Sequence, residues 1–591
     1  MAALVWAPPA HHQSGGRLRC VLGIAFVTLF IAACRNDTPK ETHNDEPQTQ
    51  RRGNTQTWFT EITDEVGLEF THETGGRGDL WLPEITGGAG AALFDYDSDG
   101  DLDIYLTNAH GGLPDRLTSR TLTNRLYRQE PSGHFVDVTQ ASGLGDGGYG
   151  MGVAIGDIDN DGRPDVYVTN LGPDRLYRNR GDGSFEDITV AAGIDVDGWS
   201  TSASFLDYDR DGFLDLYVTR YVKHHFRRRC TDQAGRREYC SPRAFVPTHD
   251  VLLHNNGDGT FTDVSSAAGI ASVAAAGLGV VCADLDDDGW MDIYVANDAY
   301  ANNLWINRRD GTFRDDAMIL GVAYNLEGQP EAGMGVLAAD LDNDLDLDLF
   351  VTHLVQETNT LYRNFGAATG FFDVTGESGL AVSSMIHTGF GTAALDIELD
   401  GDLDLVVVNG RVKLGPLLSG AEPSPPWDRY AEANLLYLND GSGRFTLNEE
   451  LAGPLCSRME ITRGLAMGDI DSDGDLDLLV ANAQGPARLY RNDAPRQGHW
   501  LMVRAVDPAL RRDAIGAKIT VVCGERSFLR TINRGFGYLS SNDPVAHFGL
   551  GSADRVDWID VRWPDGLLER FSATPADRRI ELFRGNGNAR P

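Results

Sequence analysis

Hydrophobic and polar positions repeat as a unit along most of the chain. Each unit opens with a run of small and apolar residues, such as GMGVAIG at 150–156, and passes through an acidic loop into a segment such as VYVTN at 166–170. A second apolar segment with a Gly-containing turn follows, as in LYRNRGDGSFEDIT at 176–189. Short runs rich in β-branched and aromatic residues predict strands, and the Gly and Asp clusters between them predict turns. The pattern therefore predicts an all-β fold made from one repeated unit.

The unit occurs seven times, which predicts a seven-bladed β-propeller over 57–494. Its acidic loops recur at intervals of 50 to 77 residues, a period typical of propellers and solenoids, and the small residues that open each unit suit the crowded strands around a propeller axis. The last unit stops at RND (491–493), without the F-x-D-V-T strand that ends the other units, whereas a matching segment, WFTEIT, lies at 58–63. We therefore expect the N-terminal strand to complete the last blade and to leave no long open edge.

Each unit carries the motif D-x-D-x-D-G-x-x-D or a close variant, which predicts a calcium site. Carboxylates at positions 1, 3, 5 and 9 and the backbone carbonyl of position 7 are hard oxygen ligands, which suit Ca²⁺ better than Mg²⁺, Zn²⁺ or copper. The variety of residues at position 7 fits a backbone ligand, and Gly at position 6 permits a tight turn. Up to seven Ca²⁺ ions are expected, with a structural role. The predicted ligands are Asp95, Asp97, Asp99, Asp101, Asp103, Asp157, Asp159, Asp161, Arg163, Asp165, Asp207, Asp209, Asp211, Phe213, Asp215, Asp284, Asp286, Asp288, Trp290, Asp292, Asp340, Asp342, Asp344, Asp346, Asp348, Asp396, Glu398, Asp400, Asp402, Asp404, Asp469, Asp471, Asp473, Asp475 and Asp477.

An EF-hand is excluded as the alternative to these loops. Its loop begins in the same way but needs Glu at position 12, where this chain has Leu106 or valine, and the flanking segments predict strands rather than helices. Seven loops of one spacing also argue against simple solvated turns. Two loops depart from the motif, because Leu345 replaces Gly in the fifth and Glu398 replaces Asp in the sixth. We expect Leu345 to strain its turn and these two sites to be the weakest.

The region 495–591 has a different pattern and predicts a small C-terminal β domain. Apolar and polar residues alternate, as expected for half-buried strands, in 500–506, 517–523, 528–532, 558–563 and 579–583. Asn542, Asp543 and His547 are candidate ligand-binding residues, with turn and core positions as the alternative.

These motifs resemble two known families. The loops and strands are similar to FG-GAP repeats, also called VCBS repeats, as in the calcium-binding propeller of integrin α-chains. The C-terminal signatures resemble the ASPIC/UnbV domain and read RRDAIGAKITV (511–521), GFGYLSSNDP (535–544), HFGLG (547–551) and VRWPDG (561–566). Together, over 58–585, the chain resembles the bacterial relatives of cartilage acidic protein. The resemblance implies an exported or surface-bound, calcium-binding β-propeller and implies no particular reaction.

Residues 1–34 predict an export signal of the lipoprotein type. Arg17 and Arg19 precede an apolar run of 11 residues at 21–31, which is too short to span a bilayer as a mature helix. The sequence IAAC at 31–34 resembles a bacterial lipobox, which makes Cys34 the expected lipidated residue; an ordinary secretory signal is the alternative. Residues 35–56 predict a disordered tether. We expect a lipoprotein of the outer membrane or cell surface with a periplasmic or extracellular body.

One insertion combines two cysteines with the main basic stretch of the chain. Cys230 and Cys240 lie in RRRCTDQAGRREYCSP, and export favours a disulfide between them. The basic residues form either a docking patch for an anionic polysaccharide or partner, or a solvated loop; they are Lys223, Arg227, Arg228, Arg229, Arg236 and Arg237. Other long connections would build a binding surface if they gather on one face, and they lie at 71–88, 109–125 and 410–434.

Composition narrows the function further. The chain is 41% hydrophobic and 23% charged, as in folded globular proteins. Its 87 acidic and 51 basic residues give a formal charge of −36, which disfavours nucleic-acid binding. No G-x-S-x-G, HExxH or P-loop motif is present. Polar residues outside the repeat that could serve a reaction are His72, Glu84, Asp298, Glu331, His353, His387, Arg411 and Arg463.

We therefore expect a calcium-binding surface scaffold for binding or adhesion, with a protein or a glycan as its ligand. Membrane contact is expected only through the lipid anchor. A cell-surface enzyme that acts on polysaccharide, with the propeller as its platform, is the alternative. A deep pocket with converging His, Glu and Arg side chains of perturbed pKa would favour the enzyme.

Overall fold

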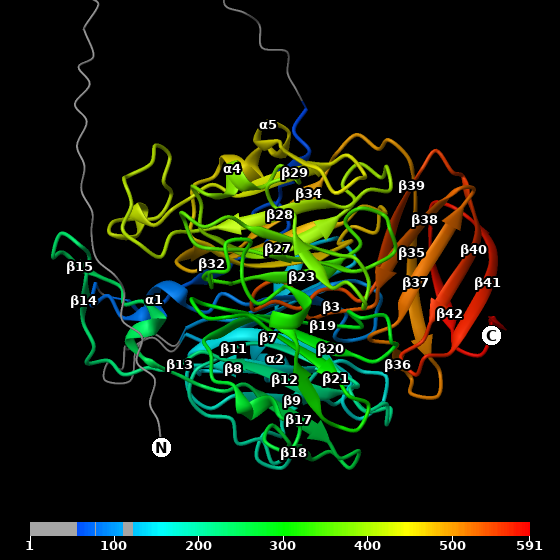
Figure 1. Cartoon of the computed structure of the whole chain (residues 1–591), viewed down its shortest axis with the longest axis horizontal. Coiled ribbons are helices and arrows are strands. Elements are labelled where there is room, and N and C mark those ends of the chain that lie inside the picture. The colour runs from blue at the N-terminus through cyan, green and yellow to red at the C-terminus, as the bar shows by residue number, and fades with distance from the viewer. Residues whose placement is uncertain (1–55, 77, 110–121, 591) are drawn as a thin grey trace, which may run out of the picture. The chain divides into compact units, whose positions relative to one another are not determined.

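The structure is a computed structural model that describes residues 56–76, 78–109 and 122–590. The predicted export signal, Cys34 and nearly all of the predicted tether lie outside these residues. The chain divides into two compact units, Met1–Asn54 and Thr55–Pro591, and every described residue belongs to the second. Strands dominate this second unit and its helices are short, so the all-β prediction is confirmed (Figure 1).

Seven four-stranded antiparallel sheets contain most of the strands of the described residues. In chain order of their first strands, they consist of β3 (Ala91–Phe94), β4 (Asp103–Leu106), β5 (Arg125–Gln129) and β6 (Phe135–Asp137); β7 (Gly150–Gly156), β8 (Asp165–Asn170), β9 (Arg175–Asn179) and β10 (Phe185–Asp187); β11 (Ser200–Leu206), β12 (Asp215–Arg220), β17 (Val251–Asn255) and β18 (Phe261–Asp263); β19 (Gly277–Ala283), β20 (Asp292–Asn297), β21 (Asn303–Asn307) and β22 (Phe313–Asp315); β23 (Val336–Ala339), β24 (Asp348–Val351), β25 (Thr360–Asn364) and β26 (Phe371–Asp373); β27 (Gly389–Leu395), β28 (Asp404–Asn409), β29 (Leu435–Asn439) and β30 (Phe445–Leu447); and β31 (Thr462–Gly468), β32 (Asp477–Asn482), β34 (Arg488–Asn492) and β1 (Phe59–Glu61).

The acidic loops are the hairpins between the first and second strands of these sheets. In the first sheet Phe94 pairs with Asp103, and in the second Gly156 pairs with Asp165, so each loop is closed by its last aspartate. The last sheet takes its outer strand from the other end of the chain, because Phe59 of β1 pairs with Asn492 of β34.

The first strands of neighbouring sheets lie against one another. They contact in the order β3, β7, β11, β19, β23, β27 and β31, and β31 also contacts β3. Glycine permits this approach, because a Cβ at Gly464 in β31 would lie only 2.2 Å from the carbonyl oxygen of Ala89. A Cβ at Gly335 would lie 2.0 Å from the carbonyl oxygen of Phe390. The small residues that open each repeat are therefore required by the packing.

The C-terminal strands form two further sheets. One has the order β36–β35–β39 with β42 parallel to β35, and the other has the order β38–β37–β40–β41–β43. These sheets contain every strand that the alternation predicted. Their bounds are β35 (His499–Asp507), β36 (Arg512–Asp513), β37 (Lys518–Cys523), β38 (Arg526–Thr531), β39 (Ala546–Gly551), β40 (Arg555–Arg562), β41 (Leu568–Pro575), β42 (Arg578–Phe583) and β43 (Asn588–Ala589).

The C-terminal sheets share a hydrophobic core with the repeats. Val521 and Trp563 belong to the same buried cluster as Ile158 and Leu214, which lie in the second and third acidic loops. The remaining elements are short and connect or cover the sheets: β2 (Thr71–His72), β13 (Val222–Lys223), β14 (Cys230–Thr231), β15 (Arg237–Glu238), β16 (Val246–Pro247), β33 (Gly485–Pro486), α1 (Leu82–Thr86), α2 (Thr139–Ser142), α3 (Ala317–Leu320), α4 (Ala381–Ser384), α5 (Glu449–Ala452), α6 (Pro454–Ser457) and the 3-10 turns Pro242–Ala244, Ile270–Ser272 and Trp427–Arg429.

A segment between β38 and β39, residues 533–543, touches the first strand of every one of the seven sheets. We call it the channel segment. Tyr538, Leu539 and Asn542 within it are at most 1% exposed. Its contacts are Ser541 with Ala92 of β3, Leu539 with Val153 of β7 and Ser202 of β11, Asn533 with Cys282 of β19, Gly537 with Val336 of β23, Tyr538 with Phe390 of β27 and Ser540 with Leu465 of β31.

Candidate metal centres and the surfaces around them

The seven acidic loops share one backbone turn. We number them loop 1 (95–103), loop 2 (157–165), loop 3 (207–215), loop 4 (284–292), loop 5 (340–348), loop 6 (396–404) and loop 7 (469–477). Gly at position 6 has a φ between 87° and 102°, and Leu345, which replaces it in loop 5, has a φ of 75°. Position 4 is also left-handed in all seven loops, with φ between 56° and 65°. The left-handed turn at position 4 was not predicted from the motif, although Ser, Asn or Asp stands there in five loops.

Hydrogen bonds tie the carboxylates into the turn. In loop 2, Asp157 accepts the backbone N–H groups of Asp161 and Gly162 at 3.2 and 2.8 Å. Asp165 accepts the N–H of Ile158 at 3.0 Å and that of Asn179, in the next strand, at 2.7 Å. The aspartate at position 9 makes the equivalent pair of bonds in the other loops. These backbone hydrogen bonds therefore hold the acidic side chains of the loops in place without a bound cation.

The same turn brings carboxylates within reach of one ion. In several loops three carboxylate side chains form a group in which each offers one oxygen, and these oxygens lie within 4.8 Å of one another. Groups from loops 1 to 4 are Asp95, Asp97 and Asp99; Asp157, Asp159 and Asp165; Asp207, Asp209 and Asp215; and Asp284, Asp286 and Asp292. Positions 1, 3 and 9 thus converge in loops 2, 3 and 4. The side chains at position 7 do other work, since Trp290 packs under Arg210 and Arg163 pairs with Asp161.

These carboxylates could hold a metal ion. Burial raises the pKa of Asp103 to about 8 and of Asp215 to about 7. It raises the pKa well above its usual value in Asp165, Asp292, Asp348, Asp404 and Asp477. The loops also contain buried oxygens without a hydrogen-bond partner, among them Oδ1 of Asp97, Asp159 and Asp342 and Oε2 of Glu398. Buried carboxylates with spare lone pairs are costly unless a cation binds them, and hard oxygens match Ca²⁺.

The two loops that depart from the motif keep the turn. In loop 5 the backbone N–H groups of Asp344 and Leu345 still donate to Asp340, at 3.1 and 3.3 Å. In loop 6 the N–H groups of Asp400 and Gly401 donate to Asp396 in the same way. The expectation that these two sites are the weakest stays a prediction.

The C-terminal sheets cover the acidic loops. Arg512 donates to Asn160 Oδ1 in loop 2 at 2.8 Å and to the carbonyl oxygen of Gly212 in loop 3 at 3.0 Å. Arg526 donates to the carbonyl oxygen of Asp400 in loop 6 at 2.8 Å. We call this side of the sheets the loop face. This contact was not predicted from the sequence, because the residues that meet are far apart in the chain.

Two details of the loop face concern residues that the sequence analysis singled out. His547 Nε2 lies 3.0 Å from the carbonyl oxygen of Gly474 in loop 7, and burial lowers its pKa to about 4. Asn542 accepts the N–H of Met467 at 3.0 Å. Both residues therefore hold the C-terminal sheets to the repeats, which is the structural role given as the alternative to ligand binding.

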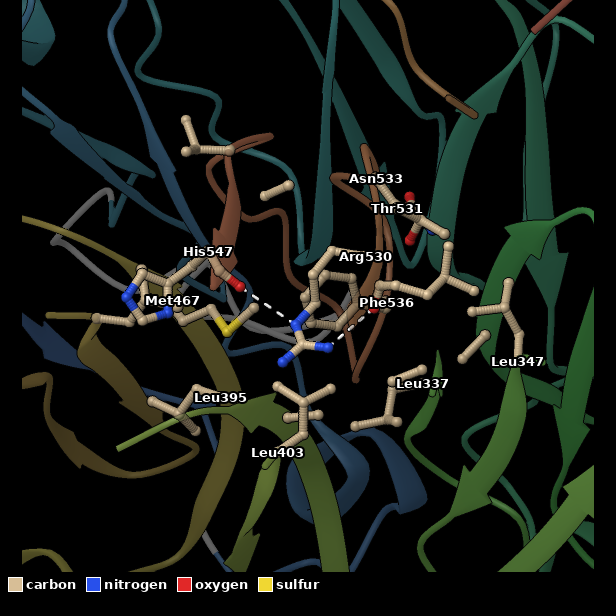
Figure 2. A pocket seen from close by; sticks show the side chains of 17 residues that line it. Leu337, Leu347, Leu395, Leu403, Met467, Arg530, Thr531, Asn533, Phe536 and His547 are labelled. Carbon is tan, nitrogen blue, oxygen red and sulfur yellow. Dashed lines mark hydrogen bonds between the residues drawn. The ribbon is translucent and has the colours of Figure 1, made fainter. Parts of the chain in front are cut away.

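Arg530 is a buried cation in this contact. Figure 2 shows its guanidinium among Leu337, Leu395, Leu403 and Met467, where it donates to the carbonyl oxygen of His547 at 3.2 Å. The surrounding apolar cavity measures about 70 Å³. Asp340 of loop 5 and Asp396 of loop 6 attract the guanidinium electrostatically. Arg530 thus places one positive charge beside two acidic loops.

The opposite side of the sheets carries the insertions, and we call it the cap face. Figure 1 shows β14 and β15 on one side of the sheets and β35–β42 on the other. The connections at 71–88, 221–248 and 410–434 do gather there, because one buried cluster contains Trp81, Tyr239, Phe245, Trp427 and Tyr430. Cys230 and Cys240 form a disulfide within the cap face, with their Cα atoms 5.2 Å apart. Most of the connection 109–125 lies outside the described residues.

Some basic residues of the insertion bind other parts of the protein, and others are exposed. Arg237 donates to the carbonyl oxygen of Asp79 at 2.6 Å, and Arg236 pairs with Asp232. Lys223, Arg227 and Arg228 are exposed. The adjacent His224 packs against Trp199, Phe226 and Phe245, and burial lowers its pKa to about 4.

Some of the polar residues outside the repeat lie close together, because Arg463 Nη2 lies 3.5 Å from the carbonyl oxygen of Arg411 and His353 lies beside Glu331. His353 Nε2 lies 3.7 Å from Glu331, and Arg411 pairs with Glu432 at 3.1 Å. Asp298 accepts a hydrogen bond from Tyr221 at 2.5 Å. The others bind backbone carbonyl oxygens: His72 that of Ala483, His387 that of Ser383, and Arg463 those of Ile85, Gly410 and Thr462.

Glu84 is a buried carboxyl group on the cap face. It is fully buried, its Oε1 has no hydrogen-bond partner, and Tyr239 donates to its Oε2 at 3.3 Å. Burial raises its pKa to about 7.

Cys282, Cys456 and Cys523 are buried free thiols. In the part of the chain that the structure describes, no helix combines the length and the apolar character needed to cross a bilayer.

Two family matches define the class of protein that this fold and these loops represent. Residues 95–168, 157–218, 244–295 and 284–351 match the FG-GAP-like repeat, and residues 507–589 match the ASPIC and UnbV family. The chain is therefore a protein of FG-GAP-like repeats with a C-terminal ASPIC/UnbV domain, an architecture that suits a binding scaffold. The resemblance inferred from the motifs is confirmed.

The chain is homologous to cartilage acidic protein 1. It is 27% identical to the Xenopus tropicalis protein over 338 residues and 28% identical to the Mus musculus protein over 365 residues. The matches cover 56% and 52% of this chain but only 40% and 54% of those relatives, so the chain spans about half of their length at most. Among solved structures, a Burkholderia pseudomallei lectin is 12% identical, with a TM-score of 0.41 over 69% of this chain and 96% of the lectin. That score is too low to carry an argument about this chain.

Proposed function

We propose that this protein is a calcium-stabilised binding scaffold built on a closed seven-bladed propeller. The observation that carries the proposal is the recurrence, in loop after loop, of buried converging carboxylates with unpartnered oxygens. Asp or Glu at positions 1, 3, 5 and 9 would hold each ion, which would neutralise the crowded charges and stabilise the folded state. Ring closure is supported by the contact of β31 with β3 and by the pairing of β1 with β34.

Calcium titration of the purified protein tests the metal part of this proposal. Saturating Ca²⁺ should raise the melting temperature by at least about 10 °C over that in excess chelator, because several sites bind only the folded state. Mg²⁺ should substitute poorly. Asp97→Asn, in loop 1, should remove one ion, whereas Asp182→Asn, an exposed aspartate outside the loops, should remove none. Equal melting temperatures with calcium and with chelator would overturn the proposal.

We place the ligand, a protein or a glycan, on the cap face, because the C-terminal sheets occupy the loop face. The cap face offers exposed apolar side chains, with Val246 and Leu417 more than 60% exposed, beside the cations Lys223, Arg227 and Arg228. A glycan array and a pull-down in saturating Ca²⁺ should give a partner that the double variant Arg227→Glu, Arg228→Glu binds less well. No partner in either assay would count against the adhesion scaffold.

The same proposal includes export and lipid attachment. Its support is the sequence at 17–34, with the basic end, the short apolar run and Cys34. Radiolabelled palmitate should enter the protein in a bacterial host and should be lost in Cys34→Ala. Incorporation that persists in Cys34→Ala would exclude Cys34 as the anchor.

A further inference from the structure

Loop 4 differs from the other acidic loops because a lysine ammonium lies in it. Lys518 Nζ, from β37 of the C-terminal sheets, lies 3.1 Å from Asp284 Oδ2 and 2.9 Å from Asp287 Oδ1. The lysine side chain is only 10% exposed. Asp284 holds position 1, which is one of the converging carboxylates of the loop. The ammonium therefore reaches a carboxylate that the motif assigns to a metal ion.

The hydrogen bonding of loop 4 also differs, although its backbone turn is that of the other loops. In loops 1, 2, 5, 6 and 7 the carboxylate at position 1 accepts the backbone N–H groups of positions 5 and 6, and in loop 3 it accepts that of position 6. In loop 4 Asp284 accepts neither, and its contact with Lys518 is an ion pair at 3.1 Å without hydrogen-bond geometry, whereas Lys518 donates a hydrogen bond to Asp287 Oδ1 at 2.9 Å. Lys518 is thus the group that this carboxylate faces.

Other cations surround loop 4. Arg309 pairs with Asp288 at 2.6 Å, and Arg562 lies 3.5 Å from Asp287. Arginines near loops 5, 6 and 7 pair instead with carboxylates at other positions: Arg363 with Asp342, Arg526 with Asp402 and Arg496 with Asp473. Among the described residues, the nearest basic group to position 1 in another loop is Arg512, 3.9 Å from Asp207. Within the described chain, only loop 4 therefore has a cation within 3.5 Å of position 1.

We propose that loop 4 binds Lys518 of the C-terminal sheets in place of a divalent cation, so that this protein holds six calcium ions and one internal ammonium. The inference rests on the proposed function, because it concerns the same set of loops. A lysine ammonium supplies one positive charge and hydrogen-bond donors to carboxylates, and it repels a second cation at short range. Loop 4 thereby anchors the C-terminal sheets directly.

Counting bound calcium tests the inference. The full-length protein is dialysed against saturating Ca²⁺, and the bound ion is measured by elemental analysis for the wild type, Lys518→Met and the matched control Lys413→Met, whose lysine is exposed. We expect six ions in the wild type, seven in Lys518→Met and six in Lys413→Met. The seventh site should bind at least about tenfold more tightly in Lys518→Met than in the wild type.

The outcomes separate this inference from the proposed function. Seven ions in the wild type, or six in a folded Lys518→Met, would overturn the role of Lys518 and leave the calcium scaffold standing. No ions in any variant would overturn both.

A measurement on the wild type decides the matter if Lys518→Met does not fold. The chain has only four lysines, Lys40, Lys223, Lys413 and Lys518, so reductive methylation followed by peptide mass spectrometry can follow each one. At saturating Ca²⁺ Lys518 should be methylated at least about tenfold less than Lys413, because its reaction requires local opening. Methylation of Lys518 to the level of Lys413 would mean that calcium has displaced it, and the inference would be wrong.

Discussion

The loop face and the cap face of the seven sheets are built by different parts of the sequence. The loop face is made by the repeat itself: seven similar hairpins present carboxylates, and the C-terminal sheets meet them with Arg512, Lys518, Arg526 and Arg530. The cap face is made by insertions of unrelated sequence that pack through aromatic side chains. The regular part of the chain thus serves an internal contact, and the irregular part is free to carry the specificity of the scaffold.

The channel segment connects these two faces. It leaves the C-terminal sheets after β38, and the hydroxyl of Tyr538 donates to the carbonyl oxygen of Thr86, at the end of α1 on the cap face, at 3.2 Å. The Tyr538 ring also lies 5.0 Å from that of Phe390. Since the segment occupies the middle of the sheets, the two faces are expected to depend on each other for stability.

Tyr538→Ala should lower the free energy of unfolding most, because it removes a buried side chain where the channel segment joins the two faces. Tyr538 is fully buried, and removing a buried aromatic side chain costs about 3–5 kcal/mol. Urea unfolding in saturating Ca²⁺ measures the loss. Tyr538→Phe keeps the ring and loses only the bond to Thr86, so it should cost about 1 kcal/mol. A cost below about 1 kcal/mol for Tyr538→Ala would show that the channel segment does not join the faces.

Glu84→Gln should reveal a pH dependence that belongs to the cap face. The pKa of Glu84 is about 7 in the folded protein, above its ordinary 4.5, so the folded state binds the proton more tightly. The contribution of Glu84 to the free energy of unfolding is therefore full below pH 4.5 and is lost as the pH rises through 7. The total loss is about 3 kcal/mol. Glu84→Gln should therefore gain stability relative to the wild type between pH 5 and pH 8.

The control for Glu84→Gln replaces an exposed carboxylate. Glu327→Gln should leave the difference in unfolding free energy between pH 5 and pH 8 as it is in the wild type. If Glu84→Gln gave the same pH profile as Glu327→Gln, the buried carboxyl would not be the source of the dependence.

The double variant Cys230→Ser, Cys240→Ser should loosen the cap face alone. The disulfide closes a loop with a sequence separation of 10, for which the loss of chain constraint is worth about 2–3 kcal/mol. Protease cleavage within 223–241 should increase, and the amount of bound calcium should stay unchanged. A fall in bound calcium would show that the loop face depends on the insertion.

The repeat could be predicted from sequence because it depends on the local spacing of residues. The contacts between distant segments could not be predicted in this way. The spacing of aspartate and glycine predicted the seven hairpins, and WFTEIT predicted that the N-terminal strand joins the last unit, where Phe59 pairs with Asn492. The channel segment reads as a turn, because its partners are spread over all seven first strands and Tyr538 and Thr86 are 452 residues apart. Lys518 reads as one polar residue in an alternating strand, and Asp284 opens an acidic loop of the full motif. Only the folded chain brings these two together.

Leu345→Gly should have the smallest effect, and it should be stabilising. Leu345 has a φ of 75° on the loop face, a conformation that costs a residue with a side chain about 1–2 kcal/mol. Glycine removes this strain, but its greater conformational freedom in the unfolded state offsets part of the gain in stability. Because the side chain is 39% exposed, little packing is lost, and a net gain of about 0.5–1 kcal/mol is expected in urea unfolding. Leu399, at position 4 of loop 6, is the matched control, since its φ is 65° but its side chain is fully buried. Leu399→Gly should destabilise by about 2 kcal/mol or more, because the loss of buried apolar surface exceeds the relief of strain. If both variants destabilised the protein, the turn in loop 5 would not be strained, and the reason to expect a weak fifth site would disappear.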